Sequence, residues 1–326
     1  MGLGQHHPEN AYEGVRALVL GASGFIGRWV ARSLCAQGAT VISAVRNRLR
    51  AEPILNRCEI RGEIIELDLQ EDRAISACLQ QVRPSITFNL AGYGVYPTER
   101  DEAVAYPINT HLIDLLCAAI SPIRDTRWPG QDIVHTGSAL EYGTIDGDLA
   151  EDLIPHPTTL YGKTKLAGTL ALARQCAVTG LKGLTARLFT VYGPGEHAGR
   201  LLPSLLQAAA SAEPLPLTAG MQKRDFTYVA DVAEGLLRLG LAPSRPGEVV
   251  NLATGRLHSV RGFVECAARI FGIAPHRLLF GALPTRAEEM QHSEVNVGRL
   301  CRMLSWTPPT GIEEGIRQTE KLLRRP

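Results

Sequence analysis

The chain has 326 residues, 45% of them hydrophobic and 21% charged, which is the composition of a globular protein with one large domain or two modest ones. Its 34 Lys and Arg nearly balance its 33 Asp and Glu, so the net charge of +1 offers no field that would gather nucleic acid or an anionic membrane surface. The seven cysteines are never spaced as CxxC, and no apolar run has the length of a signal-peptide core or a membrane helix, so we expect buried thiols, no metal and a cytoplasmic location.

The amino-terminal half of the chain alternates short β-branched runs with longer helical stretches. Residues 1–14 lack this pattern and are expected to form a flexible tail. From residue 15 onward, the alternation is typical of a parallel sheet with helices on both faces. Strands are predicted at 15–20, 40–45, 64–67, 86–89, 133–136 and 184–188. The predicted fold class is therefore α/β, with a doubly wound parallel sheet.

The regular alternation ends after Arg187, where prolines punctuate short elements that repeat no βα period. We predict one domain over 15–188, with returning segments near 226–253. A smaller C-terminal lobe is predicted over 189–225 and 254–326. No Gly/Ser linker separates the two parts, so we expect them to interleave and to share one cleft.

A glycine-rich turn, GASGFIG at 21–27, directly follows the first predicted strand and opens a helix. Gly21 allows the tight turn, Gly24 lets backbone N–H groups approach a pyrophosphate, and Gly27 lets the helix pack against the sheet. Such a turn can be purely structural, but strand, turn and helix in this order favour a Rossmann dinucleotide site. Ser23, Phe25 and Ile26 are predicted to contact the cofactor as well.

The end of the second predicted strand indicates which dinucleotide is bound. An NAD site would place an Asp or Glu about 20 residues after the glycines, and none stands there. Instead, Arg46, Asn47 and Arg48 follow the strand, and guanidinium groups at this point would pair with the 2′-phosphate of NADP. The alternative is a solvated arginine loop. We predict NADP(H), with NAD(H) possible, and Arg46 as the first contact.

Further candidate cofactor contacts lie at the carboxyl ends of later strands, where open α/β sheets bind ligands. Asp68 is placed to meet the adenine edge, although it could equally cap the following turn. The remaining candidates are Leu69, Leu90, Ala91, Gly92 and Asn109.

Three polar residues form a candidate catalytic group. Tyr161 and Lys165, in YGKTK (161–165), lie four apart on one face of a predicted helix. A protonated lysine near a phenol favours the phenolate, which makes the tyrosine a useful acid or base. Ser138, just past the fifth strand, can converge on the same point. A tyrosine and lysine at this spacing alone would more often decorate a surface.

The segments GASGFIG (21–27), NLAG (89–92), GSALEYG (137–143), YGKTK (161–165), RLFTVYGPG (187–195) and QKRDFTYVADVAEG (222–235) occur in this order. With them, nearly the whole chain resembles the extended short-chain dehydrogenase/reductase family of nucleotide-sugar epimerases, dehydratases and ketoreductases. The resemblance implies that Tyr161 is the acid/base, that Lys165 holds the nicotinamide ribose and tunes Tyr161, and that Ser138 hydrogen-bonds the reacting oxygen. It also implies a homodimer formed by helices around Tyr161, including one over 103–119.

The resemblance further implies a nucleotide-sugar substrate. Arg224 and Arg286 fall where such enzymes hold the diphosphate, with Arg200 as a third candidate, because guanidinium forks bind phosphate oxygens bidentately. Each arginine alone could be a surface residue. Thr190 stands where many relatives have an asparagine that contacts a substrate phosphate.

Other positions also depart from the family pattern. Asn89 stands where a histidine is frequent, and Tyr93 and Tyr96 belong to an unusual loop on the substrate side. These tyrosines could stack on a sugar or close over the nicotinamide, and they could equally be core aromatics.

The reaction is predicted from the residues after Ser138. Family dehydratases carry an acidic residue two places after this serine or threonine, whereas this chain has Ala139 and Leu140, although Glu141 lies one place further. NADPH use favours net reduction, and GSALEYG resembles the 4-ketoreductases. We expect NADPH-dependent reduction of a keto group on a nucleotide-linked 4-keto-6-deoxysugar.

Three alternatives stay open. The first is a nucleotide-sugar epimerase that uses bound NAD(P). The second is a reductase of a lipid-like or aromatic ketone, against which the paired arginines argue. The third is a non-catalytic dinucleotide-sensing protein of the same fold, since fold alone does not fix function.

Overall fold

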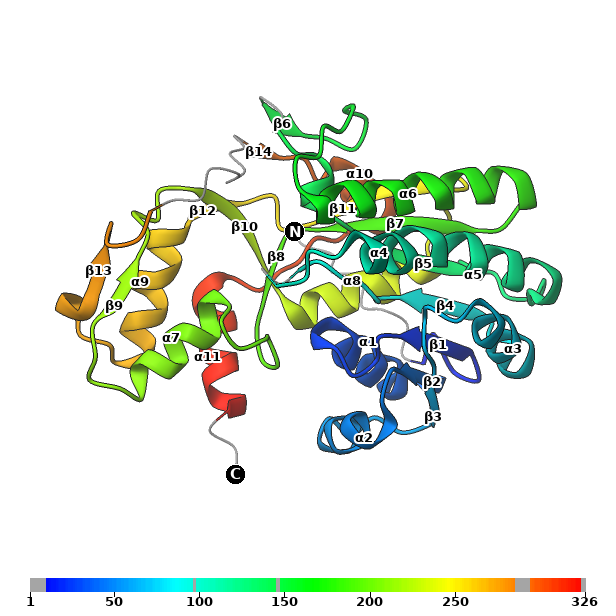
Figure 1. Ribbon diagram of the computed structural model, residues 1–326, viewed down its shortest axis with the longest axis horizontal. Coiled ribbons are helices and arrows are strands. Elements are labelled where there is room, and N and C mark those ends of the chain that lie inside the picture. Colours follow the sequence, from blue (N-terminus) through cyan, green and yellow to red (C-terminus); the bar gives the residue numbers. More distant parts are fainter. Residues whose placement is uncertain (1–9, 96–97, 145–146, 285–293, 324–326) are drawn as a thin grey trace.

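The structure is a computed structural model that describes residues 10–95, 98–144, 147–284 and 294–323. Its large sheet has seven parallel strands in the order β11-β7-β5-β4-β1-β2-β3 (Figure 1). The strands are β1 (Arg16–Leu20), β2 (Thr40–Val45), β3 (Glu63–Glu66), β4 (Ile86–Asn89), β5 (Ile133–Ser138), β7 (Gly183–Leu188) and β11 (Glu248–Leu252). The six predicted strands and the doubly wound α/β class are confirmed.

Helices cover both faces of this sheet. One face packs against α1 (Phe25–Ala36), α2 (Arg48–Arg57) and α8 (Val229–Leu241). The other face packs against α3 (Asp72–Val82), α5 (Leu112–Ile120) and α6 (Leu160–Thr179). Because strand side chains alternate between faces, Ala17 and Val19 of β1 join the first core while Leu18 and Leu20 join the second. The central strands are therefore apolar on both sides.

The remaining strands form smaller sheets. One sheet has the order β12 (Leu257–Ser259), β10 (Lys223–Tyr228) and β8 (Thr190–Tyr192). Two pairs are β13 (Leu278–Phe280) with β9 (Leu215–Leu217), and β14 (Glu294–Val295) with β6 (Asp148–Leu149).

The remaining helices include α7 (Leu201–Ala209), α9 (Val260–Phe271), α10 (Gly298–Leu304) and α11 (Ile312–Leu323). Figure 1 shows α7, α9 and α11 with β9 and β13 to one side of the large sheet. The short helices are α4 (Glu102–Tyr106), the π-helix η1 (Pro107–His111), and the 3₁₀ turns η2 (Ser121–Ile123), η3 (Ala139–Glu141) and η4 (Pro275–Arg277). The exact division into two domains stays a prediction.

The predicted tail over 1–14 is wrong for its last residues. Tyr12 is fully buried, and its hydroxyl donates to the Leu237 carbonyl at 2.7 Å. Its ring packs beside Phe88 and Trp128. Burial of a large aromatic side chain stabilises this segment on the core. Residues 1–9 lie outside the described part of the chain.

The cysteines differ from one another in exposure. Cys78, Cys117 and Cys176 are buried as predicted, and burial raises the pKa of the Cys117 thiol to about 12. Cys301 is exposed, so the expectation of burial is wrong there. Its position on α10 faces solvent because the helix buries only Leu300.

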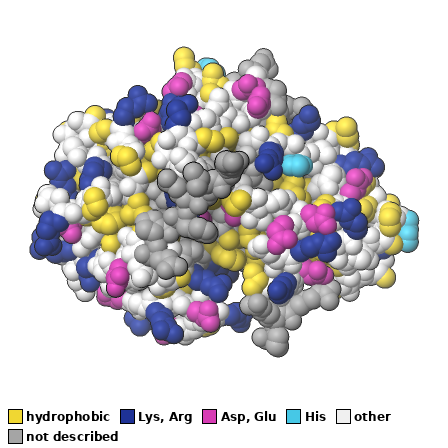
Figure 2. Space-filling model, turned by 180° about the vertical axis from the view of Figure 1, so that it is seen from behind, with side chains coloured by type: hydrophobic (Ala, Val, Ile, Leu, Met, Phe, Trp, Pro, Cys, Tyr) yellow, Lys and Arg dark blue, Asp and Glu magenta, His cyan; other side chains and the backbone are white. Residues whose placement is uncertain are grey.

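A helical stretch, Glu102–Ile123, is long and apolar enough by length and composition to cross a membrane. This stretch alone is weak evidence for a membrane span, because the core helix of a soluble protein passes the same test of length and composition. Leu112, Ile113 and Leu116 within it are buried in the core formed with α3 and α6. On the face shown in Figure 2, basic and acidic side chains are interspersed.

Candidate active site

A cavity of about 540 Å³ lies where the carboxyl ends of β1, β4 and β5 meet β8, β10 and the segment 196–200. These strand ends are where open α/β sheets bind ligands. The cavity wall brings together most of the predicted site residues, namely Gly21, Gly24, Phe25, Ile26, Gly27, Leu90, Ala91, Gly92, Ser138, Tyr161, Lys165, Thr190, Arg200 and Arg224.

Other predicted residues do not line this wall. They are Ser23, Arg46, Asn47, Arg48, Asp68, Leu69, Tyr93 and Asn109. Arg286 and Tyr96, which were also singled out, lie outside the described residues.

The glycine turn fits a pyrophosphate. Gly21 has a φ of +77°, and a Cβ on Gly27 would lie 2.1 Å from the Gly21 carbonyl oxygen, so a side chain at Gly27 is excluded. Helix α1 begins at Phe25, and its first turn carries no acidic residue and no side-chain cap. The helix N–H groups therefore point toward the cavity with a positive dipole end, which suits an anion.

Three residues after β2 were predicted to contact the cofactor, and the side chains of two of them form hydrogen bonds within the protein. The Asn47 side chain caps α2 by accepting from the Arg50 N–H at 2.9 Å. The Arg48 guanidinium donates to the Ile64 carbonyl at 3.2 Å. Arg46 is exposed at the end of β2. Glu66 of β3 accepts from the Arg48 N–H at 2.7 Å, so a carboxylate absent from the local sequence lies beside this loop.

Asp68 has the capping geometry that the sequence left open. Its Oδ1 accepts from the Gln70 N–H at 2.9 Å in the turn before α3. The neighbouring Leu69 packs against the core under α3 and α5. Both residues therefore have structural contacts of their own.

Asn109 is fully buried in the π-helix η1, and its amide is used within the protein. Its Oδ1 accepts from the Tyr93 N–H at 3.0 Å, and its Nδ2 donates to the Tyr93 carbonyl at 2.7 Å and to Thr164 Oγ1 at 2.8 Å. These bonds join the Tyr93 loop to α6. Asn109 therefore supports the cavity wall from behind.

Helix α6 presents Tyr161 and Lys165 to the cavity. Thr159 caps the helix by accepting from the Gly162 N–H at 3.0 Å, so Tyr161 lies in the first turn. Lys165, one turn later, is 1% exposed. Gly94 has a φ of +105°, and a Cβ there would lie 3.2 Å from the Tyr161 ring. A glycine is thus needed for the loop to close over the tyrosine.

Burial shapes the proton affinity of both groups. It raises the pKa of Tyr161 above its ordinary value of 10, with a further contribution from the Glu141 carboxylate, while the Arg200 guanidinium opposes the rise. Burial also lowers the pKa of Lys165 to about 8. The lowering of the tyrosine pKa that the sequence suggested is therefore opposed by desolvation.

Ser138 ends β5 and caps the 3₁₀ turn η3. Its hydroxyl accepts from the Leu140 N–H at 3.2 Å, and its own N–H donates to Glu141 Oε1 at 2.7 Å. Glu141 is fully buried and accepts from Arg187 Nε at 2.8 Å and from Thr169 Oγ1 at 3.1 Å. Its carboxylate is thus held behind the cavity wall, where it fixes the backbone of Ser138.

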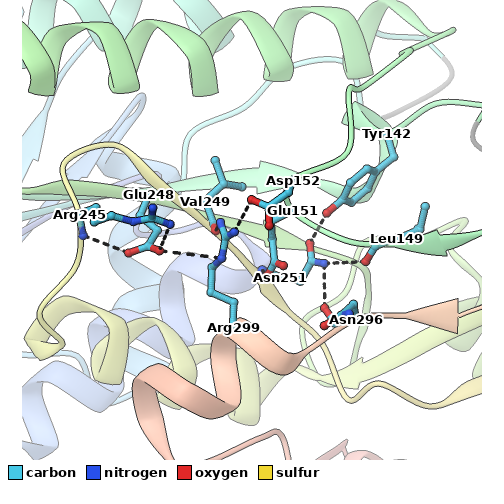
Figure 3. Close-up of polar contacts among 10 residues, drawn as sticks. All are labelled: Tyr142, Leu149, Glu151, Asp152, Arg245, Glu248, Val249, Asn251, Asn296 and Arg299. Carbon is cyan, nitrogen blue, oxygen red and sulfur yellow. Dashed lines mark hydrogen bonds and ion pairs between the residues drawn. The ribbon is translucent and has the colours of Figure 1, made fainter.

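A polar network continues from this ion pair to the C-terminal segments, and Figure 3 shows the part of it from Tyr142 to Asn296. The Arg187 guanidinium stacks on the Tyr142 ring at 4.5 Å, and the Tyr142 hydroxyl donates to Asn251 Oδ1 at 2.8 Å. Asn251 Nδ2 donates to the carbonyls of Leu149 and Asn296, each at 3.0 Å. The network joins the Ser138 turn to β6, β11 and the residue directly after β14.

The same region is clamped at its edge by Arg299 (Figure 3). Its guanidinium donates to the Val249 carbonyl at 2.8 Å and to the Asp152 carboxylate. Glu248 lies 3.9 Å from its Nε and also pairs with Arg245 at 3.2 Å. These contacts are partly exposed, and they fix segments that support the site without facing it.

The part of the cavity wall for which the sequence predicted substrate contacts is built by β8, β10 and the segment before α7. Thr190 starts β8 and is paired in register with Phe226 of β10. Arg224 precedes Asp225, whose buried carboxylate accepts from the Thr254 and Arg256 N–H groups at 3.0 and 3.1 Å. Asp225 thereby fixes the strand that carries Arg224.

Sequence reasoning missed Glu196. It lines the cavity, its side chain is 6% exposed, and its Oε1 lies 3.5 Å from Arg200 Nε. Burial raises its pKa to about 7. The only local signal was an acidic residue directly after Gly193-Pro194-Gly195, and its burial depends on packing that the local sequence does not display.

The profile of the NAD dependent epimerase/dehydratase family matches residues 17–253. The chain belongs to this family, and the predicted assignment to NAD(P)-dependent enzymes of the extended short-chain dehydrogenase/reductase type is confirmed.

Individual relatives cover most of the chain. It is 29% identical to dTDP-6-deoxy-L-talose 4-dehydrogenase (NAD(P)(+)) of Kitasatospora kifunensis, over 93% of this chain and 94% of the relative. It is 26% identical to UDP-glucose 4-epimerase of Mycolicibacterium smegmatis, over 95% and 99%. Solved structures of MoeE5 with NAD and UDP-glucose or UDP-glucuronic acid share 28% identity, with TM-scores of 0.80 and 0.79, over 95% of this chain and 99% of MoeE5.

Proposed function

We propose that the protein uses NADPH to reduce a keto group on a nucleotide-activated 4-keto-6-deoxysugar. The observation that carries this proposal is one cavity whose wall holds Ser138, Tyr161 and Lys165 beside the glycine turn at Gly21. A dinucleotide held by its pyrophosphate at this turn would extend along the strand ends toward Tyr161. The similarity to a deoxysugar 4-dehydrogenase supports the same substrate class.

Each catalytic residue has a defined task in this reaction. The reduced nicotinamide supplies a hydride when it is bound. Tyr161 donates its hydroxyl proton to the substrate oxygen, and its raised pKa keeps that proton in place at neutral pH. Ser138 donates a hydrogen bond to the same oxygen, and the Lys165 ammonium holds the ribose and stabilises the tyrosinate left behind.

The residues after Ser138 favour reduction over dehydration. Ala139 and Leu140 line the cavity where an eliminating enzyme needs a proton-transferring side chain. The nearby Glu141 is bound to Arg187 and does not line the cavity. Glu141 is therefore not placed to exchange a proton with a ligand in the cavity.

The substrate diphosphate is assigned to Arg224, Arg200 and Arg286, and the sugar to the side of Thr190 and Tyr93. The first two arginines and Thr190 line the cavity. We also propose a cytoplasmic homodimer that pairs through α5 and α6, and α6 exposes the apolar side chains of Leu170 and Val178.

The principal alternative is a nucleotide-sugar epimerase that keeps its NAD, a reaction known among the relatives. A dinucleotide sensor of the same fold would need no proton donor in the cavity. Mass spectrometry of the small molecules released from the purified protein distinguishes these alternatives from the reductase. Retained NAD would favour the epimerase, whereas a protein free of cofactor that consumes NADPH would favour the reductase.

Cofactor preference is tested by fluorescence titration of NADPH and NADH. We expect NADPH to bind at least about tenfold more tightly than NADH. Arg46→Ala is expected to remove most of this preference while leaving NADH affinity unchanged, because only the 2′-phosphate differs. Arg57→Ala, an exposed arginine at the end of α2, is the control. Equal affinities in the wild type would contradict the NADP assignment.

A further inference from the structure

Glu196 is a buried carboxylate on the cavity wall. It follows the loop Gly193–Gly195 and precedes α7, and its side chain is 94% buried, since only 6% is exposed. Its Oε2 is buried and has no hydrogen-bond partner among the described residues. Orphaned buried oxygens of this kind are rare in folded proteins, because the lost hydration costs free energy.

The surroundings of Glu196 place it near the reacting end of the cavity. Its Oε1 faces Arg200 Nε at 3.5 Å. Arg200 and Tyr161 line the same cavity, and the Arg200 guanidinium opposes the rise in the pKa of the Tyr161 hydroxyl. The loop that carries Glu196 is fixed by Trp29 Nε1, which donates to the Pro194 carbonyl at 3.0 Å. Glu196 therefore lies between the cofactor helix α1 and the substrate side.

We propose that Glu196 determines sugar specificity, by accepting a hydrogen bond from a hydroxyl of a neutral sugar and by excluding a hexuronate. This inference rests on the proposed function, because it requires a nucleotide sugar in the cavity. A carboxylate is an acceptor only, so its orphaned oxygen matches a hydroxyl donor. It does not match a second carboxylate, which would be repelled at close range in a site of low dielectric.

The ion pair of Glu196 with Arg200 adds to the selection of a neutral sugar over a hexuronate. Arg200 lines the same cavity, and its guanidinium would by itself attract the carboxylate of a uronic acid. Glu196 occupies one side of this guanidinium and neutralises it. Burial raises the pKa of Glu196 to about 7, so the carboxylate, and with it the repulsion of a uronate, is fully developed only above neutral pH. Replacing Glu196 by glutamine would remove the repulsion and release Arg200 at constant side-chain volume.

The test is isothermal titration calorimetry on the full chain loaded with NADP⁺. The probes are UDP-glucose and UDP-glucuronic acid, which differ at C6, and dTDP-glucose as a second neutral sugar. We expect the wild type to bind UDP-glucose at least about tenfold more tightly than UDP-glucuronic acid, and Glu196→Gln to reduce this ratio by at least about tenfold. The control, Glu213→Gln, removes one negative charge from an exposed site outside the cavity and should leave the ratio unchanged.

A second variant separates charge from shape. Glu196→Asp keeps the charge but withdraws it by one methylene, so it should weaken UDP-glucose binding while still rejecting UDP-glucuronic acid. A wild type that binds the uronate as tightly as the neutral sugar overturns the inference without any variant. A Glu196→Gln protein that keeps its NADP⁺ affinity and the wild-type ratio of affinities for UDP-glucose and UDP-glucuronic acid also overturns the inference. A wild type that binds NADP⁺ but none of the three sugar nucleotides overturns the inference, and the proposed function fails as well only if this protein also does not oxidise NADPH with dTDP-4-keto-6-deoxyglucose.

Discussion

Lys165 carries a positive charge that the fold disfavours. The residue is 1% exposed, and burial lowers its pKa from 10.5 to about 8. Its folded pKa lies below its unfolded pKa, so the folded protein holds the proton less tightly than the unfolded chain. The resulting loss of stability is fully present below pH 8 and disappears as the pH rises from 8 to 10.5. A costly charge in a cavity indicates a functional requirement.

Replacement of this lysine should therefore stabilise the protein and inactivate it. Lys165→Met is expected to raise the free energy of unfolding at pH 7 by up to roughly 3 kcal/mol, because each pKa unit corresponds to about 1.4 kcal/mol. The gain should vanish near pH 10.5. Urea unfolding at both pH values measures it, with the exposed Lys163→Met on the same helix as control. A Lys165→Met protein that is less stable at pH 7 would contradict this account of the charge.

At the scale of elements, the Glu141–Arg187 pair joins β5, η3 and β7 beneath Ser138. The side chains are 0% and 3% exposed, and their closest atoms lie 2.8 Å apart. Arg187 Nη1 is buried and has no hydrogen-bond partner among the described residues. Such a pair contributes little net stability compared with apolar residues, but removal of one partner leaves a buried charge without compensation.

For the Glu141–Arg187 pair, we predict that the effects of substituting the two residues on the free energy of unfolding are not additive. Arg187→Met should destabilise the protein by about 3–5 kcal/mol, because it leaves the Glu141 carboxylate buried without its cation. The double variant Glu141→Gln/Arg187→Met should recover a large part of this loss, since neither charge of the pair then remains buried. Equilibrium unfolding in urea measures both. A double variant no more stable than Arg187→Met alone would show that packing, and not charge, governs this region.

The elements also show what the sequence could predict. The glycine turn, the six strands and the Tyr161–Lys165 helix were predictable because each depends on residues that are close in the chain. Glu141 and Arg187 lie 46 positions apart, and Glu66 reaches the Arg46 loop from a different strand. The burial of Glu196 likewise depends on tertiary packing. Contacts of this kind leave no periodic pattern in the sequence.

Some residues predicted to bind the cofactor also have structural contacts within the protein, and their cofactor contacts stay predictions. Asn47 and Asp68 use their side chains to cap local backbone, and Asn109 joins the Tyr93 loop to α6. Short polar side chains compete for such backbone groups wherever a strand ends. The sequence could place them near the site but could not tell a ligand contact from a cap.

At the scale of the whole molecule, one cavity spans the edge of the large sheet and the substrate side. Gly21 and Gly24 come from the turn after β1, Tyr161 and Lys165 from α6, and Arg200 and Arg224 from segments beyond β7. A cofactor and a substrate bound in the same cavity would meet near Tyr161. This arrangement allows transfer between two ligands, for which a purely sensing role has no use.

The central claim is that Tyr161 supplies the proton in an NADPH-dependent reduction. The most direct measurement is the rate of NADPH oxidation with dTDP-4-keto-6-deoxyglucose, for the wild type and for Tyr161→Phe. We expect turnover in the wild type, a loss of about 10²-fold or more in the variant, and NADPH affinity that is unchanged. Full activity of Tyr161→Phe, or conversion of the sugar by the wild type without consumption of NADPH, would contradict the claim.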